Sequence, residues 1–159
     1  MAEYSTFIEI DASPVEVFEF LTTVDGLTAW MGEQAVLDPV EGGGFAVDIA
    51  GYPVRGCYLH VDPPTRVVVS WGVAGSDALP AGASTVAFTL VPIAGGTRVE
   101  LTHSDLPDTE VAGHADGWAH FLARLGVAAP GGVCGPDDWR PLPARNDLHR
   151  AAVAAVDGE

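Results

Sequence analysis

The sequence has no lysine and few basic residues of any kind. Its 159 residues contain 22 acidic residues against seven arginines, so the formal net charge at pH 7 is −15. A surface this negative repels the phosphates of nucleic acids and the head groups of anionic membranes. We therefore expect neither a nucleic-acid partner nor a membrane partner.

Long apolar runs, a basic leader and paired cysteines are also missing. A membrane-spanning helix needs about 18 or more consecutive apolar residues, and a signal peptide needs a charged segment before an apolar one. The two cysteines, Cys57 and Cys134, form no CxxC pair, which argues against both a disulfide framework and a zinc site. Together these absences predict a cytoplasmic protein.

Apolar residues make up 48% of the chain and charged residues only 18%. Disordered chains have the opposite balance, and a chain of this length is typical of one domain. We expect residues 1–127 to form that domain. Residues 128–159 begin with a stretch rich in glycine and proline, and we expect them to form an extension with a short alanine-rich helix over 147–156.

The spacing of apolar residues predicts a strand, two short helices, six more strands and a long helix. The first strand covers 4–11, and Ser13-Pro14-Val15-Glu16 has the capping-box pattern of a helix start. A second short helix is expected over 26–30. Alternating residues between glycine or proline turns predict strands over 36–39, 45–49, 54–61, 66–71, 84–92 and 97–103. Residues 111–125 show the periodicity of an amphipathic helix.

Strands joined by short turns form an antiparallel sheet, whose apolar face must pack against another element. The long helix is the obvious partner. We predict an α+β fold in which a curved antiparallel sheet wraps around the C-terminal helix, with a cavity between them. On the strand over 54–61 the pattern places Cys57 beside Leu59 on one face, and we expect an inert buried thiol there.

Short motifs in order along the chain support this fold. They are Ile10–Phe18, Leu27–Met31, Asp38–Phe45, Asp62–Trp71, Gly95–His103, and His114 with Gly117-Trp118. Together they resemble the START-like, or helix-grip, superfamily, in the branch named after the C-terminal domain of the activator of the heat-shock-protein-90 ATPase. The resemblance implies the fold but no single activity, because this fold hosts carriers, cyclases, hydrolases and co-chaperones.

Two histidines are the candidates for acid–base chemistry. His103 follows Thr97, Val99 and Leu101 at alternate positions and therefore points inward. His114 lies on the apolar stripe of the long helix, so the two imidazoles can meet. Our first interpretation is a pair of hydrogen-bonded core histidines that anchor helix to sheet. The alternative is catalysis, since burial lowers an imidazole pKa and can tune an acid or base.

The sequence offers no pattern for a metal or a cofactor. Asp116 and His120 lie near the two histidines along the chain, but on a helix they point to other sides. The glycine runs over 42–44 and 95–96 lack the strand-to-helix setting of a phosphate loop. No nucleophile-elbow motif is present. We predict no metal and no cofactor.

Three functions remain open at this point. The leading hypothesis is binding of a hydrophobic or amphipathic small molecule in the cavity. The alternatives are a cyclase, dehydratase or hydrolase that uses His103 and His114, and a co-chaperone-like role in which the negative charge steers a basic partner. A homodimer is also open, and Trp139 is expected to pack back onto the domain. The residues expected to line the cavity are Trp30, Phe45, Cys57, Trp71, Phe88, His103, His114, Trp118 and Phe121.

Overall fold

One strand, two short helices, six strands and one long helix follow each other along the chain, as predicted. The computed structural model describes residues 2–140. The elements are β1 (Ala2–Ile10), α1 (Pro14–Thr22), α2 (Val24–Thr28), β2 (Gln34–Leu37), β3 (Gly44–Ile49), β4 (Tyr52–Asp62), β5 (Arg66–Trp71), β6 (Ser84–Ile93), β7 (Gly96–Leu106), the 3-10 turn η1 (Asp108–Glu110) and α3 (Val111–Ala128). The helix expected over 147–156 lies outside the described residues.

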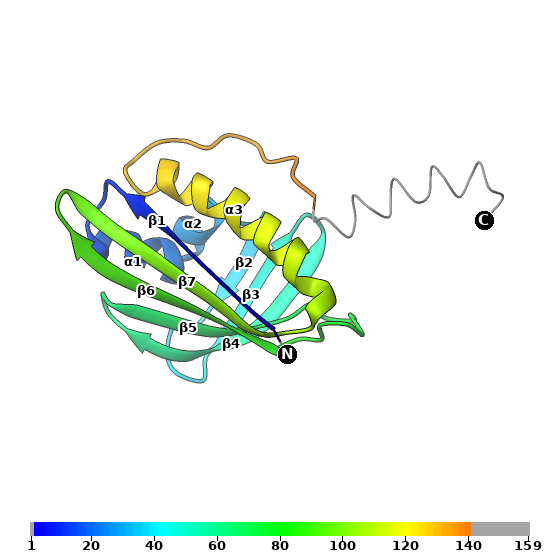
Figure 1. Cartoon of the computed structure of the whole chain (residues 1–159). Helices are drawn as coiled ribbons and strands as arrows, with labels where there is room; N and C mark the ends of the chain where they lie inside the picture. Colours follow the sequence, from blue (N-terminus) through cyan, green and yellow to red (C-terminus); the bar gives the residue numbers. More distant parts are fainter. Residues whose placement is uncertain (1, 141–159) are drawn as a thin grey trace.

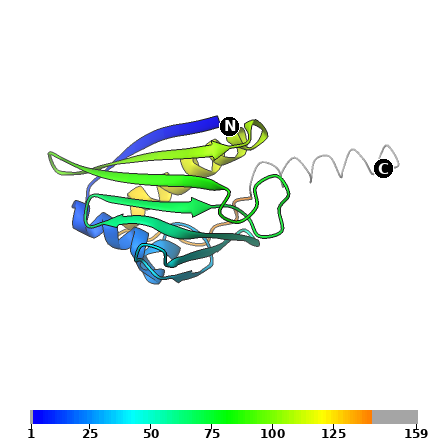
Figure 2. The same ribbon diagram turned by 90° about the horizontal axis from the view of Figure 1, so that it is seen from below.

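The seven strands form one antiparallel sheet in the order β1-β7-β6-β5-β4-β3-β2. β1 pairs with β7, so the first and last strands lie side by side. The sheet curves around α3, which runs along its concave face (Figure 1). Seen from below, the strands lie in front of the three helices (Figure 2). This arrangement is the predicted helix-grip fold.

The start of α1 has the capping box that the sequence predicts. The Ser13 hydroxyl accepts a hydrogen bond from the backbone N–H of Glu16, and the Glu16 carboxylate accepts one from the backbone N–H of Ser13. Such a cap contributes about 1 kcal/mol to helix stability. It directs the helix so that Val17 and Leu21 are buried in the core.

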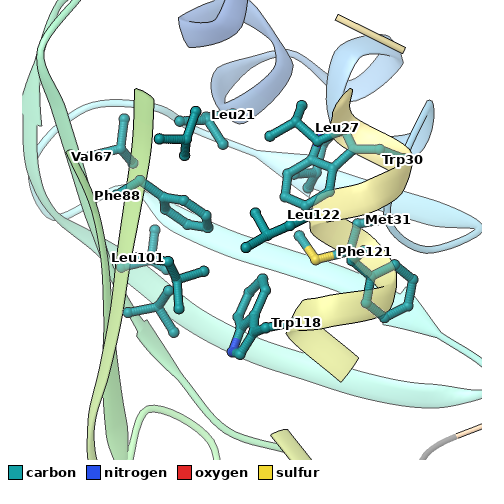
Figure 3. Close-up of a cluster of buried hydrophobic side chains, with 14 of the residues drawn as sticks. Leu21, Leu27, Trp30, Met31, Val67, Phe88, Leu101, Trp118, Phe121 and Leu122 are labelled. Atoms are coloured by element: carbon teal, nitrogen blue, oxygen red, sulfur yellow. The ribbon is translucent and has the colours of Figure 1, made fainter. Parts of the chain in front are cut away.

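The main core lies between the sheet and the helices. Side chains from α1, β6, α3 and the segment after α2 point toward one another there: Leu21, Phe88, Trp118, Leu122 and Trp30 (Figure 3). All five are buried, and the rings of Trp30 and Phe88 meet edge to face. The indole N–H of Trp30 donates to the carbonyl of Phe20 at 2.9 Å, so its polar atom is satisfied. Each such side chain contributes about 1.5–3 kcal/mol when fully buried.

Tyr58 faces the core from β4, with none of its surface exposed. Its hydroxyl donates to the backbone carbonyl of Leu21 at 3.2 Å. Successive side chains of a strand point to opposite faces, so Cys57 and Leu59 lie on the outer side. Leu59 is 47% exposed and Cys57 is half-buried. The prediction of a buried thiol at Cys57 was therefore wrong, because the large tyrosine with a buried hydrogen-bond partner sets the inward face.

Gly56 marks a close approach between β4 and β5. A Cβ atom at this position would overlap the backbone carbonyl oxygen of Ser70, which belongs to the neighbouring strand. Backbone atoms of a central strand cannot move aside without disturbing the hydrogen bonds to the neighbouring strands. Gly44 on β3 is different, because a Cβ there would meet nothing within 4 Å.

We expect Gly56→Ala to lower the free energy of unfolding by about 1–3 kcal/mol, the usual cost of overpacking. The matched control Gly44→Ala should stay within about 0.5 kcal/mol of the wild type, because its new methyl group meets open space. Urea denaturation of both variants measures the difference. Equal stability of Gly56→Ala and the wild type would contradict the close approach.

Candidate ligand-binding site

A hollow of about 230 Å³ lies beside the first half of α3, facing β3, β4 and β5, and is partly open to solvent. Its wall is mainly apolar and aromatic. The apolar and aromatic side chains of the wall are Met31, Ile49, Tyr52, Val54, Trp71, Val73, Trp118, Phe121 and Trp139. The polar side chains are those of Ser76, Glu110 and His114.

Four residues expected at the cavity line this hollow: Trp71, His114, Trp118 and Phe121. The other five residues expected there do not belong to the lining. They are Trp30, Phe45, Cys57, Phe88 and His103.

The reasons for this differ from residue to residue. Trp30 and Phe88 pack on each other in the main core, and Phe45 packs against the rings of Tyr58 and Trp71. Cys57 lies on the outer side of β4. Its backbone N–H donates to the Ser70 hydroxyl.

His103 lies beneath the hollow and is fully buried. The indole N–H of Trp118 donates to its Nδ1 at 3.0 Å. Its Nε2 lies 2.8 Å from the hydroxyl oxygen of Ser84, and that hydroxyl donates to the carbonyl of Trp71 at 2.7 Å. These bonds join α3 to β7, β6 and β5.

The partners of His103 determine where its proton sits. An indole N–H can only donate, so Nδ1 must accept and carries no proton. The Ser84 hydroxyl uses its hydrogen on the Trp71 carbonyl, and therefore accepts from the proton on Nε2. Both nitrogens are thus occupied in the neutral imidazole. His103 has no lone pair or proton to offer a substrate.

Burial keeps His103 neutral. Desolvation is the main cause that lowers its pKa to about 3, and the neighbouring His114 adds to the effect. The two imidazole rings meet edge to face, with 4.8 Å between their centroids. The predicted contact between the histidines is therefore present, and His103 is a satisfied core histidine that orients Trp118.

His114 differs because it lines the hollow. Its Nδ1 lies 2.9 Å from the backbone carbonyl oxygen of Glu110, which can only accept, so Nδ1 carries the proton. Its Nε2 has no hydrogen-bond partner among residues 2–140. Burial lowers the pKa of His114, although the carbonyl and carboxylate of Glu110 act in the opposite direction. The neutral ring therefore has an acceptor nitrogen that no group in the described part of the chain contacts as a donor.

Residues 130–140, which we call the C-terminal strap, run back along α3 (Figure 1). The Trp139 ring stacks on His120 and meets Phe121 edge to face, and its N–H donates to Asp116. Gly117 allows this approach, since a Cβ there would lie 3.3 Å from the Trp139 ring. Trp139 thus packs back onto the domain, as predicted. It also forms part of the wall of the hollow.

The strap is also held by charged groups. The Asp137 carboxylate accepts from Nε2 of His120 at 3.0 Å and lies 3.7 Å from Nε of Arg124. Partial burial tends to raise the pKa of Asp137, but the hydrogen bonds and the charges of His120 and Arg124 outweigh it and lower the pKa. Cys134 donates its S–H to the carbonyl of Arg124.

Sequence reasoning missed Glu110 as a wall residue. Its spacing of four residues from His114 was the available signal, because residues four apart on a helix are neighbours.

Within residues 2–140, no three histidine, cysteine, aspartate or glutamate side chains converge as metal ligands. No helix in that range is long and apolar enough to cross a membrane.

Stability should fall as the pH drops below about 6.5. An unfolded histidine takes up a proton near pH 6.5, whereas folded His103 does so near pH 3. The contribution of neutral His103 to the free energy of unfolding is therefore complete above pH 6.5 and is lost as the pH falls toward 3. The loss approaches about 1.4 kcal/mol per pH unit for each such histidine. Urea denaturation between pH 7.5 and 5 should show this slope, and His103→Gln should reduce it. An unchanged slope in the variant would exclude His103 as its source.

Removing the Trp139 ring should release the strap from α3. Trp139→Ala abolishes the stack on His120 and the bond to Asp116, so the strap amides should lose protection in hydrogen exchange while the sheet keeps its own. The control is Val133→Ala, since Val133 belongs to the same strap but is 90% exposed. Full protection of the strap in Trp139→Ala would show that other contacts hold it.

The chain has relatives of known structure. An AHSA1-like protein from Rhizobium etli is 38% identical, with a TM-score of 0.70 over 87% of this chain and 88% of that one. Aha1 from Colwellia psychrerythraea, whose solution structure is a dimer, is 25% identical, with a TM-score of 0.73 over 83% and 98%. CalU16 from Micromonospora echinospora is 26% identical, with a TM-score of 0.68 over 81% and 76%.

No curated protein matches the chain. Residues 11–129 match the family model described as Activator of Hsp90 ATPase homolog 1-like protein. This match covers well over half of the sequence and agrees with the START-like motifs and the helix-grip fold. The chain therefore belongs to the activator of Hsp90 ATPase homolog 1-like family.

Proposed function

We propose that this protein binds a hydrophobic or amphipathic small molecule in the hollow between the sheet, α3 and the strap. The observation that carries the proposal is an apolar, aromatic wall around a space that is partly open to solvent. Ligand sites are typically concave and mostly apolar, with a few polar groups that orient the ligand. Ser76, Glu110 and His114 are suited to that orienting role.

The volume favours a compact ligand. A protein cavity of about 150 Å³ can hold benzene. The hollow of about 230 Å³ therefore suits a molecule with one or two rings, or a short branched chain. A long lipid would have to project through the open side.

One polar atom at the wall supports a ligand with a hydrogen-bonding group. Nε2 of His114 can accept a hydrogen bond, and no residue among 2–140 donates to it. A donor on a bound molecule would satisfy this nitrogen.

An enzyme of the cyclase, dehydratase or hydrolase kind is the second candidate. One observation favours it, namely the unprotonated nitrogen of His114 at the hollow, which a general base requires. His103 would support such chemistry only by orienting Trp118. Once a substrate is known, full turnover by His114→Phe would exclude this candidate.

Three further proposals accompany the main one. The dimer of Colwellia Aha1 supports a homodimer for this chain. A co-chaperone-like interaction stays open because the matching family model is named after an activator of the Hsp90 ATPase. The two free cysteines are in keeping with a cytoplasmic location, where thiols stay reduced.

Binding of the neutral two-ring fluorophore 1-naphthylmethanol tests the main proposal. We expect one site per chain, and a loss of affinity of at least about tenfold in Gly113→Leu, which fills the hollow. Leucine also favours a helix over glycine by about 1 kcal/mol, so helix destabilisation would not explain the loss. The control Ala112→Leu changes the exposed neighbour and should bind like the wild type. No binding by the wild type, or equal binding by Gly113→Leu, would refute the proposal.

A further inference from the structure

The charged side chain on the wall of the hollow is negative. Glu110 lines it, and no arginine does among the described residues. The Glu110 carboxylate lies 3.9 Å from Nδ1 of His114, but the proton of that nitrogen is directed to the backbone carbonyl of Glu110. Because burial lowers the pKa of His114, the imidazole provides no positive charge at neutral pH. The carboxylate at the wall therefore has no cationic partner in residues 2–140.

Aromatic rings form much of the remaining wall. Trp71 and Trp118 lie with 5.1 Å between their ring centroids, and Phe121 and Trp139 with 4.9 Å. The face of an aromatic ring carries partial negative charge and attracts a cation, most strongly for tryptophan. An aromatic wall beside a carboxylate is therefore a good environment for an ammonium group on an apolar ligand.

The hydrogen-bonding groups agree with the charge. Nε2 of His114 accepts and cannot donate, since the proton of the neutral ring is on Nδ1. The Ser76 hydroxyl accepts from the backbone N–H of Leu79 and keeps both its proton and a lone pair, so it discriminates against neither class of ligand. The net charge of −15 also raises the local concentration of cations around the protein. A carboxylate ligand would be repelled by Glu110 and could not donate to Nε2 of His114.

We propose that the ligand of this hollow is an apolar amine, protonated at neutral pH, whose rings contact the aromatic wall and whose ammonium group pairs with Glu110 and donates to His114. This inference rests on the proposed function, because it names the chemical class of the ligand for the same site. It assigns Glu110 as the residue that selects for charge.

Three probes of one shape test the inference by calorimetric titration at low ionic strength. They are 1-naphthylmethylamine as the cation, 1-naphthylmethanol as the neutral compound and 1-naphthoate as the anion. We expect the amine to bind about tenfold more tightly than the alcohol, which corresponds to one ion pair with a cation–π contribution. The naphthoate should bind more weakly than the alcohol.

Glu110→Gln should remove the advantage of the amine and keep the affinity for the alcohol, which also shows that the variant is folded. Asp108→Asn removes the same charge two residues away, from an exposed side chain outside the wall. This variant should keep the preference for the amine. It therefore separates the effect of the Glu110 charge from the effect of the overall negative charge of the protein.

The outcomes distinguish the two proposals. If the alcohol binds and the amine has no advantage, or if Asp108→Asn loses the preference as fully as Glu110→Gln, the amine inference is wrong and the binding function stands. If none of the three probes binds to the wild type, the binding function itself fails. Tighter binding of the naphthoate would assign the opposite class of ligand.

Discussion

The hydrogen bonds of His103 connect the long helix to the middle of the sheet. Trp118 on α3 donates to His103 on β7, His103 donates to Ser84 on β6, and Ser84 donates to the carbonyl of Trp71 on β5. Each group has its partner, which matters because an unsatisfied buried polar group costs about 1–3 kcal/mol. The chain of bonds permits only one tautomer of the imidazole and one orientation of the helix tryptophan.

This constraint also shapes the hollow. Trp71 and Trp118 stand at the two ends of the hydrogen-bond chain, and both belong to the wall. His103 is therefore remote from a ligand but determines the surface that a ligand would contact. His114 has the complementary role, because it packs against His103 with its ring and presents an unprotonated nitrogen to the hollow.

The strap adds a packed segment beyond the end of α3. The family match ends at residue 129, and the strap begins at residue 130. Its Trp139 nevertheless contributes to the wall, through a stack on His120 and an ion pair one turn further along α3 between Asp137 and Arg124. Part of the wall of the hollow thus comes from a segment outside the family match.

The sequence by itself determined the order of the elements, the capping box at Ser13, the inward direction of His103 and the overall fold. These depend on local periodicity and turn chemistry, which neighbouring residues specify. The tertiary structure decided the rest. It placed Tyr58 rather than Cys57 toward the core, put Trp30 and Phe88 in the packed core rather than at the hollow, and brought Glu110 and Trp139 to the wall. Those outcomes depend on which side chains from distant segments compete for the same space and for the same hydrogen-bond partners. That competition is settled only when the sheet, α3 and the strap are packed together.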